Sequence, residues 1–202
     1  NYMIGSEAQG RDAIDYLKLS LEMAKEMGAE FVLTSPANGG YLATYDQLWS
    51  RLEKNIQELG DYAAKLEIKL VVEALTPYES NFFTRANDLV ELFRRVDNPY
   101  VVGMCDIVPP FVQHESIMAY FDKLGNKMDH MHIIDGENGS DTHLIPGEGN
   151  IPIKEMLYEM KRIGYDKTAT LELVTNYINE PRFYAKRAID NMRELMAEAG
   201  IV

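Results

Sequence analysis

Cysteine, basic residues and long apolar runs are all scarce in this sequence of 202 residues. Its single cysteine, Cys105, excludes an internal disulfide and every metal motif built on paired cysteines. Cys105 lies between Met104 and Asp106 in an apolar run. This position predicts a small buried residue rather than a nucleophile.

Positive charge is in short supply. The chain has 20 lysines and arginines against 32 aspartates and glutamates, which gives a net charge of -12. Such a charge repels phosphate backbones and anionic membrane surfaces, so we expect neither a nucleic acid nor a membrane as partner. The longest apolar runs, such as KLVVEAL, are far shorter than a membrane-spanning helix, and no basic leader precedes them. We therefore expect a cytoplasmic protein.

What the sequence does contain is a regular alternation of helical and strand patterns. Apolar residues recur at helical spacing in the segments 14–24, 49–63, 89–93, 116–124, 153–160 and 181–199. Between these segments stand five short apolar runs, EFVLTS, KLVVEAL, VVGMCDI, DHMHIID and TATLELV. Strands that are apolar on both faces and separated by helices are typical of a parallel sheet covered by helices. The predicted fold class is therefore α/β.

A closed (β/α)8 barrel and an open doubly wound sheet both fit this alternation. An open sheet would gather its polar residues beside a glycine-rich turn, but GxGxxG is absent after the first strand, where SPANGG stands. In a barrel, side chains from the ends of several successive strands converge on one mouth. The polar residues at the ends of the predicted strands follow the second arrangement.

Four predicted strands carry a residue able to bind a metal near their carboxyl ends: Glu73, Asp106, His132 and Glu172. Each lies about one βα repeat from the next, so the four come from consecutive strands. Taken singly, each could be a structural ion-pair or hydrogen-bond partner. Three neighbouring buried carboxylates, however, repel one another unless a cation neutralises them. The set predicts a divalent metal site, and its oxygen and nitrogen donors suit Mn2+ while leaving Mg2+, Co2+ or Zn2+ open.

The stretch HMHIIDGENGSDTHLIPGEG, residues 130 to 149, joins the strand of His132 to an acidic loop. His130 has the same parity along the strand as His132, so it should point the same way, packed one layer deeper. His143 lies in the loop, where we expect it to be exposed and mobile near the mouth. It is either a substrate contact or an ordinary solvated residue.

Four stretches of the chain resemble the xylose-isomerase-like TIM-barrel superfamily: VVEALTPYESN, YFDKLG, HMHIIDGENGSDTHLIPGEG and LELVTNYINEPRFYA. Within it they are most similar to ketose 3-epimerases of the D-tagatose 3-epimerase type, above all to those that act on fructoselysine. The resemblance covers nearly the whole chain. It implies that Glu73, Asp106, His132 and Glu172 bind one divalent ion, usually Mn2+, and that Glu73 and Glu172 also exchange protons with the sugar. It further implies that Glu79 contacts substrate hydroxyls near the reacting carbon.

The activity implied by this resemblance is metal-dependent epimerisation at C3 of a ketose or of a fructosamine conjugate such as fructoselysine. One carboxylate removes a proton to form an enediolate, and another returns a proton to the opposite face. An aldose–ketose isomerase, an inosose dehydratase and a catalytically inactive sugar-binding barrel remain as alternatives. A DNA-cleaving member of the superfamily would need more histidines than the four present and a cationic surface. The expected partner is a small-molecule sugar, and a homo-oligomer is left open.

Two features depart from the family pattern. Some members carry a histidine and an arginine where this chain has Pro109 and Asn138. Recognition of the substrate's carbonyl end must therefore differ, with His143 or Gln113 as candidate substitutes. A barrel also needs eight strands, and the first of the five strands here resembles the fourth of the barrel. We expect residues 1–202 to form a single TIM-barrel domain that lacks its first three βα units.

Overall fold

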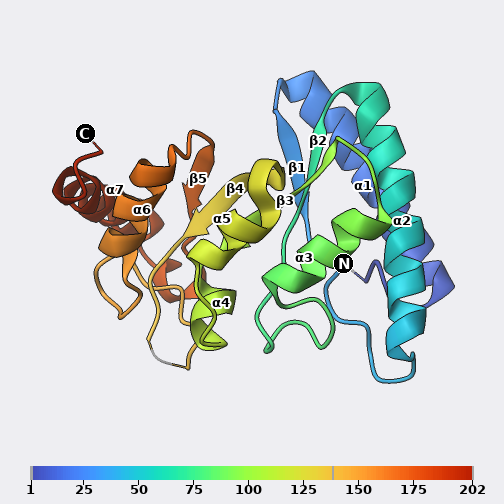
Figure 1. Cartoon of the computed structure of the whole chain (residues 1–202), viewed down its shortest axis with the longest axis horizontal. Coiled ribbons are helices and arrows are strands. Elements are labelled where there is room, and N and C mark those ends of the chain that lie inside the picture. Colours follow the sequence, from blue (N-terminus) through green and yellow to red (C-terminus); the bar gives the residue numbers. More distant parts are fainter. Residues whose placement is uncertain (1, 138, 202) are drawn as a thin grey trace. The chain divides into compact units, whose positions relative to one another are not determined.

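The computed structural model describes residues 2–137 and 139–201. The chain divides into two compact units, which are described separately. The first unit comprises residues 1–104 and 123–129, and the second comprises residues 105–122 and 130–202. Each unit combines parallel strands with helices (Figure 1), so the α/β class predicted from the sequence is confirmed.

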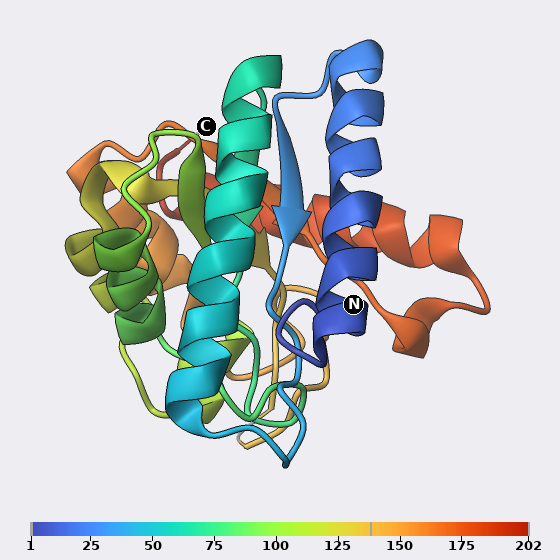
Figure 2. The ribbon, with the colours of Figure 1, turned by 90° about the vertical axis from the view of Figure 1, so that its right-hand side faces the viewer.

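The first unit packs two long helices beside three parallel strands. In chain order its elements are α1 (Glu7–Met27), β1 (Phe31–Thr34), α2 (Tyr45–Leu66), β2 (Lys69–Val72), α3 (Ala86–Arg95), the start of β3 (Val101–Asp106) and a short 3-10 helix (Gly125–Lys127). β1 pairs with β2 and β2 pairs with β3. The helices α1 and α2 lie side by side next to β1 (Figures 1 and 2). Their facing stripes of apolar residues are buried.

Local signals explain where α1 begins and ends. The side chain of Ser6 accepts a hydrogen bond from the backbone of Gln9, while the side chain of Gln9 accepts one from the backbone of Ser6. This reciprocal cap satisfies two amide groups that the first turn of a helix leaves without partners. Gly28 ends the helix with a φ of 71°, in the left-handed region that glycine adopts at little cost.

The second unit contains the rest of the strands. In chain order its elements are the end of β3, α4 (Val108–Val112), most of α5 (Met118–Leu124), β4 (Met128–Ile133) from His130 onward, α6 (Ile153–Ile163), β5 (Thr168–Leu171), a 3-10 helix (Thr175–Tyr177) and α7 (Pro181–Glu198). β4 and β5 are parallel, with His132 opposite Thr170. α6 ends at Gly164, whose φ of 74° lies in the left-handed region, and α7 begins at Pro181. The helix α4 was not predicted, and two prolines lie in its first turn.

Burial along the strands follows the predicted pattern except in β1 and β5. Phe31, Val32 and Leu33 of β1 are only partly buried. β3 and β4 are buried along their whole length, and Cys105 is buried as expected. β5 differs, because Thr168, Ala169 and Thr170 are exposed. Among the described residues this strand pairs only with β4.

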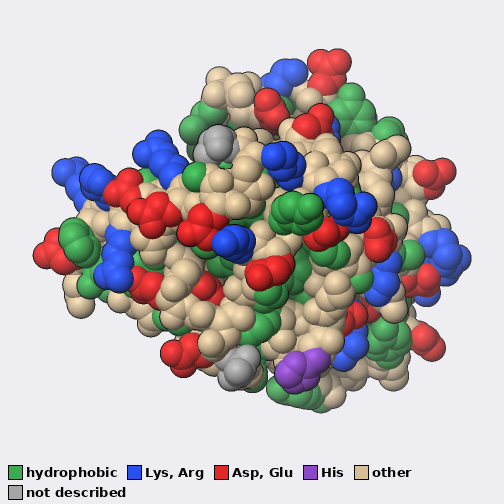
Figure 3. All heavy atoms as spheres, turned by 60° about the vertical axis from the view of Figure 1, so that its left-hand side comes forward, with side chains coloured by type: hydrophobic (Ala, Val, Ile, Leu, Met, Phe, Trp, Pro, Cys, Tyr) green, Lys and Arg blue, Asp and Glu red, His purple; other side chains and the backbone are tan. Residues whose placement is uncertain are grey.

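On the face drawn in Figure 3, lysine and arginine side chains lie among aspartates and glutamates, with apolar side chains between them. Within the described ranges, no helix combines the length and the apolar character needed to cross a bilayer. The location inferred from the sequence stays a prediction. The same holds for the expected single barrel domain and for the homo-oligomer.

Candidate metal and substrate site

Three of the four predicted metal ligands belong to the second unit, at the carboxyl ends of its strands. Asp106 is the last residue of β3, His132 lies one residue before the end of β4, and Glu172 directly follows β5. The backbone of Ile107 donates to the carbonyl of His132, and β4 pairs with β5 in parallel. Because the carboxyl ends of parallel strands meet at one edge, the three side chains reach a common region.

Distances within this region are short. Nδ1 of His132 lies 3.2 Å from Oε2 of Glu172. Oδ1 of Asp106 accepts a hydrogen bond of 2.8 Å from the backbone of Val108, at the start of α4, which holds the carboxylate in place. Its other oxygen, Oδ2, lies 3.9 Å from Nε2 of His143. Asp106 and His132 are both buried.

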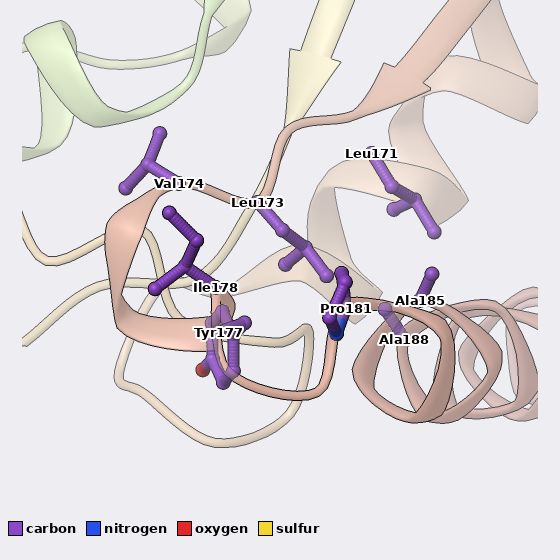
Figure 4. A pocket seen from close by; sticks show the side chains of 8 residues that line it. All are labelled: Leu171, Leu173, Val174, Tyr177, Ile178, Pro181, Ala185 and Ala188. Carbon is purple, nitrogen blue, oxygen red and sulfur yellow. The ribbon is translucent and has the colours of Figure 1, made fainter.

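The orientation of Glu172 follows from its two apolar neighbours. Leu171 and Leu173 line a cavity of about 440 Å³ beside α7, together with residues such as Ile178 and Pro181 (Figure 4). Side chains alternate along an extended chain, so Glu172 points to the opposite side. The sequence LEL therefore directs one carboxylate toward the histidines while two leucines pack against α7.

His143 corrects one expectation from the sequence. We predicted an exposed, mobile loop residue, but its side chain is buried and only 8% of the residue is exposed. Nε2 of His143 lies 3.1 Å from Oε2 of Glu172, and Nδ1 lies 3.0 Å from Oδ1 of Asp141. One potential ligand atom each from Asp106, His143 and Glu172 lies within 4.8 Å of the others. The loop folds back into the site, so the prediction of exposure was wrong.

The charges of this cluster shift two pKa values in opposite directions. Burial alone would lower the pKa of His143, but its hydrogen bonds to Asp141 and Glu172 and the charge of Asp106 raise it to about 10. Burial alone would raise the pKa of Glu172. Hydrogen bonds and positive charge from His132 and His143 instead hold that pKa far below its usual range. These histidines and carboxylates thus partly neutralise one another in the described structure.

The loop that carries His143 closes around a second buried carboxylate, Asp135. Its oxygens accept hydrogen bonds of 2.9 Å from each of three backbone amides, those of Gly136, Gly147 and Ile151. A Cβ atom at Gly149 would lie 2.5 Å from Oδ1 of Asp135, so only glycine fits there. Sequence reasoning missed both Asp135 and Asp141. The signal for Asp135 was an aspartate at the end of a buried strand, followed by glycines in the next loop.

His130 occupies the packed position predicted for it. Its ring is buried, and its two nitrogens lie 2.7 Å and 3.1 Å from the hydroxyls of Thr168 and Thr170 on β5. The rings of His130 and His132 meet edge to face, with centroids 5.5 Å apart. His130 therefore supports the strand position of His132.

Glu73 and Glu79 belong to the first unit and are described there. Glu73 directly follows β2, is buried, and donates its backbone amide to the carbonyl of Thr34 over 3.0 Å. Glu79 is exposed, and its carboxylate accepts hydrogen bonds from the backbone and the hydroxyl of Thr76. The roles expected for both glutamates stay predictions.

Two further residues were named for recognition of the carbonyl end of a substrate. Gln113, at the end of α4, donates its side-chain amide to the carbonyl of Pro109 over 3.1 Å. His143 instead reaches the carboxylates of the cluster. Asn138 lies outside the described residues.

Comparison with known proteins places the chain in a family. Residues 2–195 match the family model described as the xylose isomerase-like TIM barrel. Fructoselysine 3-epimerase of Shigella flexneri is 46% identical over 198 residues, which are 98% of this chain and 72% of that relative. Its name is that of an isomerase, the class predicted here from the sequence.

Solved structures share the fold at lower identity. A D-tagatose 3-epimerase-like protein gives a TM-score of 0.80 at 21% identity, covering 98% of this chain and 73% of the other. The IOLI protein, solved with a bound zinc atom, gives 0.77 at 20% identity, covering 97% and 73%. At these identities the likeness concerns the fold, and it agrees with the predicted barrel. The chain belongs to the xylose isomerase-like TIM barrel family.

Proposed function

We propose that this protein is a metal-dependent ketose 3-epimerase whose substrate is a fructosamine conjugate such as fructoselysine. The observation that carries the proposal is the convergence of Asp106, His132 and Glu172 at the carboxyl ends of three successive strands. Such convergence is how barrels of this kind build their active sites. The isomerase class agrees with the named relatives, and the fructosamine substrate rests on the 46% identity to a fructoselysine 3-epimerase.

The residues of the cluster fit a divalent cation. Buried carboxylate oxygens and imidazole nitrogens lie within reach of one another, and the single cysteine is not among them. We assign Asp106, His132 and Glu172 as ligands. Glu73 is assigned as the fourth ligand from the family resemblance of the sequence. This mixed oxygen and nitrogen set suits Mn2+, with Mg2+, Co2+ or Zn2+ as alternatives. A bound divalent ion supplies positive charge that stabilises the negative charge developing on the substrate oxygens.

Two glutamates move the proton. Glu73 and Glu172 are assigned as the acid–base pair, one removing the C3 proton and the other returning a proton to the opposite face of the planar enediolate. Inversion requires a carboxylate on each side, because a single carboxylate could only return the proton to the face it left. Glu79 and His143 are assigned to substrate hydroxyls and to the carbonyl end of the sugar.

The test is proton exchange with solvent. The wild-type protein is incubated with Mn2+ in D2O, separately with fructoselysine, with psicoselysine and with each of a panel of free ketoses. NMR then measures the incorporation of deuterium at C3. We expect deuterium to enter C3 in the wild type, with interconversion of the two epimers. Glu73→Gln and Glu172→Gln should each abolish interconversion of the epimers, because the remaining carboxylate can return the proton only to the face it left. Calorimetry measures how much Mn2+ binding the remaining ligands retain.

A matched control is Glu155→Gln, which makes the same chemical change at an exposed position on α6. It should exchange deuterium at the wild-type rate. Absence of exchange at C3 for every ketose would refute the mechanism. Deuterium at C1 or C2 with formation of an aldose would replace epimerisation by aldose–ketose isomerisation.

A further inference from the structure

We propose that Asp135 is a positioning residue, which fixes the loop of residues 139–151 so that His143 meets Glu172. The catalytic meaning of this contact rests on the function proposed above, but the anchor itself is a feature of the second unit alone. Within the described part of the chain, the carboxylate of Asp135 accepts its hydrogen bonds from backbone amides and not from a predicted ligand, so its influence on the site must pass through the loop.

The anchor joins the middle and the last residue of the loop to Asp135, two residues after the end of β4. Asp135 and Leu144 exchange two backbone hydrogen bonds of 2.7 Å, directly beside His143. The carboxylate of Asp135 then binds the amides of Gly147 and Ile151 farther along the chain. The backbone of the returning segment lies so close that Gly149 has no room for a Cβ atom. The buried side chain of Asp135 thus holds the segment of the loop that follows His143 in place.

A second set of bonds ties the loop to the segment after Glu172. The side chain of Asn176 donates to the carbonyl of Thr142 over 2.6 Å, and the amide of Ile145 donates to the hydroxyl of Tyr177 over 2.9 Å. Both contacts flank His143 in the sequence. The loop and the segment that follows Glu172 are therefore held together, with Asp135 fixing one side and Asn176 and Tyr177 the other.

The backbone of His143 itself shows why an anchor is needed. Its φ is 47°, in the left-handed region that residues other than glycine adopt only at a cost. Such a conformation persists only where surrounding contacts impose it. Loosening the anchor allows this residue to relax toward ordinary backbone angles, which moves its ring away from Glu172.

The variant Asp135→Asn keeps the shape of the side chain but replaces one acceptor oxygen by an NH2 group facing a backbone amide. We expect kcat/KM for the epimerised ketose to fall about 10- to 100-fold, as is usual when a catalytic contact is misplaced. Calorimetry should show Mn2+ affinity within about twofold of the wild type, because no assigned ligand is changed. Asp166→Asn, an exposed position before β5, is the matched control and should behave as the wild type.

A double-mutant cycle separates positioning from simple stability. If Asp135 acts through His143, Asp135→Asn costs little in a protein that already carries His143→Ala. The proposal is overturned if the fall in kcat/KM of the double variant equals the product of the falls in the two single variants. It is also overturned if Asp135→Asn has the kcat/KM of the wild type. If Asp135→Asn does not fold, the same cycle is run with Asn176→Ala, which loosens the loop at an exposed residue.

Hydrogen exchange provides a readout independent of activity. The amides of residues 139–151 should exchange faster in Asp135→Asn than in Asp166→Asn, while those of α6 stay unchanged. This result would support the anchor even if no ketose were epimerised and the proposed function failed. Unchanged protection of the amides of Gly147 and Ile151 in Asp135→Asn would overturn it whatever the activity.

Discussion

Replacing Glu58 with glutamine removes a charge that joins the two long helices of the first unit. Glu58, on α2, accepts two hydrogen bonds from the guanidinium of Arg11, at 2.9 Å and 3.2 Å, and one from Lys18 at 2.6 Å. Arg11 and Lys18 both lie on α1. Hydrogen bonds from Arg11 and then from Lys18 lower the pKa of Glu58 from 4.5 to about 2.

The magnitude follows from linkage and from exposure. A pKa shift of this size would correspond to about 3 kcal/mol of folding free energy if the group were fully shielded from solvent. Glu58 retains 32% of its side-chain exposure and Arg11 46%, so solvent screens the interaction. We therefore expect Glu58→Gln to lower the free energy of unfolding by about 1 kcal/mol. For a chain of this length that is a fall of about 2–4 °C in Tm.

The sign of the pH dependence is set by the depressed pKa. Because the folded pKa lies below the unfolded one, the stabilisation is fully present above about pH 4.5 and is lost as the pH falls toward 2. Urea unfolding of wild type and Glu58→Gln at pH 7 and at pH 3 measures this directly. The difference between them should shrink at the lower pH and in 1 M salt, roughly as expected for a screened pair.

Asp12→Asn, an exposed carboxylate on α1, serves as the matched control and should leave the free energy of unfolding nearly unchanged. A difference between wild type and Glu58→Gln that is equal at pH 7 and pH 3 would refute the linkage. Equal stability at pH 7 would show that the ion pairs between α1 and α2 contribute nothing.

Two further predictions concern the second unit and the metal. Tyr177→Phe leaves the buried amide of Ile145 without its acceptor, so the free energy of unfolding should fall by about 1–3 kcal/mol in urea titrations. Tyr158→Phe changes an exposed tyrosine on α6 and is the control. Equal falls in the free energy of unfolding of the two variants would contradict the reasoning. Treatment with a chelator should lower Tm, and Mn2+ at about 100 times its Kd should restore about 2.7 kcal/mol. A Tm that does not change when Mn2+ is removed or added would argue against the metal site.

Much of the fold was readable because its signals are local. Helical spacing acts within a few residues of the chain, and so do the residues that end or start a helix: Gly28, Gly164 and Pro181. The structure has helices over the segments that the spacing predicts. The short helix α4 was not predicted, because its proline-rich sequence has no apolar residues at helical spacing. The strand β5 was predicted but its exposure was not, because the exposure of a strand depends on which elements pack against it.

For the candidate site, the sequence by itself determined which strand ends carry Asp106, His132 and Glu172, because strand period and repeat length are properties of the chain alone. Only the tertiary structure decided the place of His143. Its contact with Glu172 spans 29 positions of the chain and depends on a loop folded around Asp135. Sequence periodicity cannot specify such a return, since it arises from backbone hydrogen bonds between residues distant along the chain.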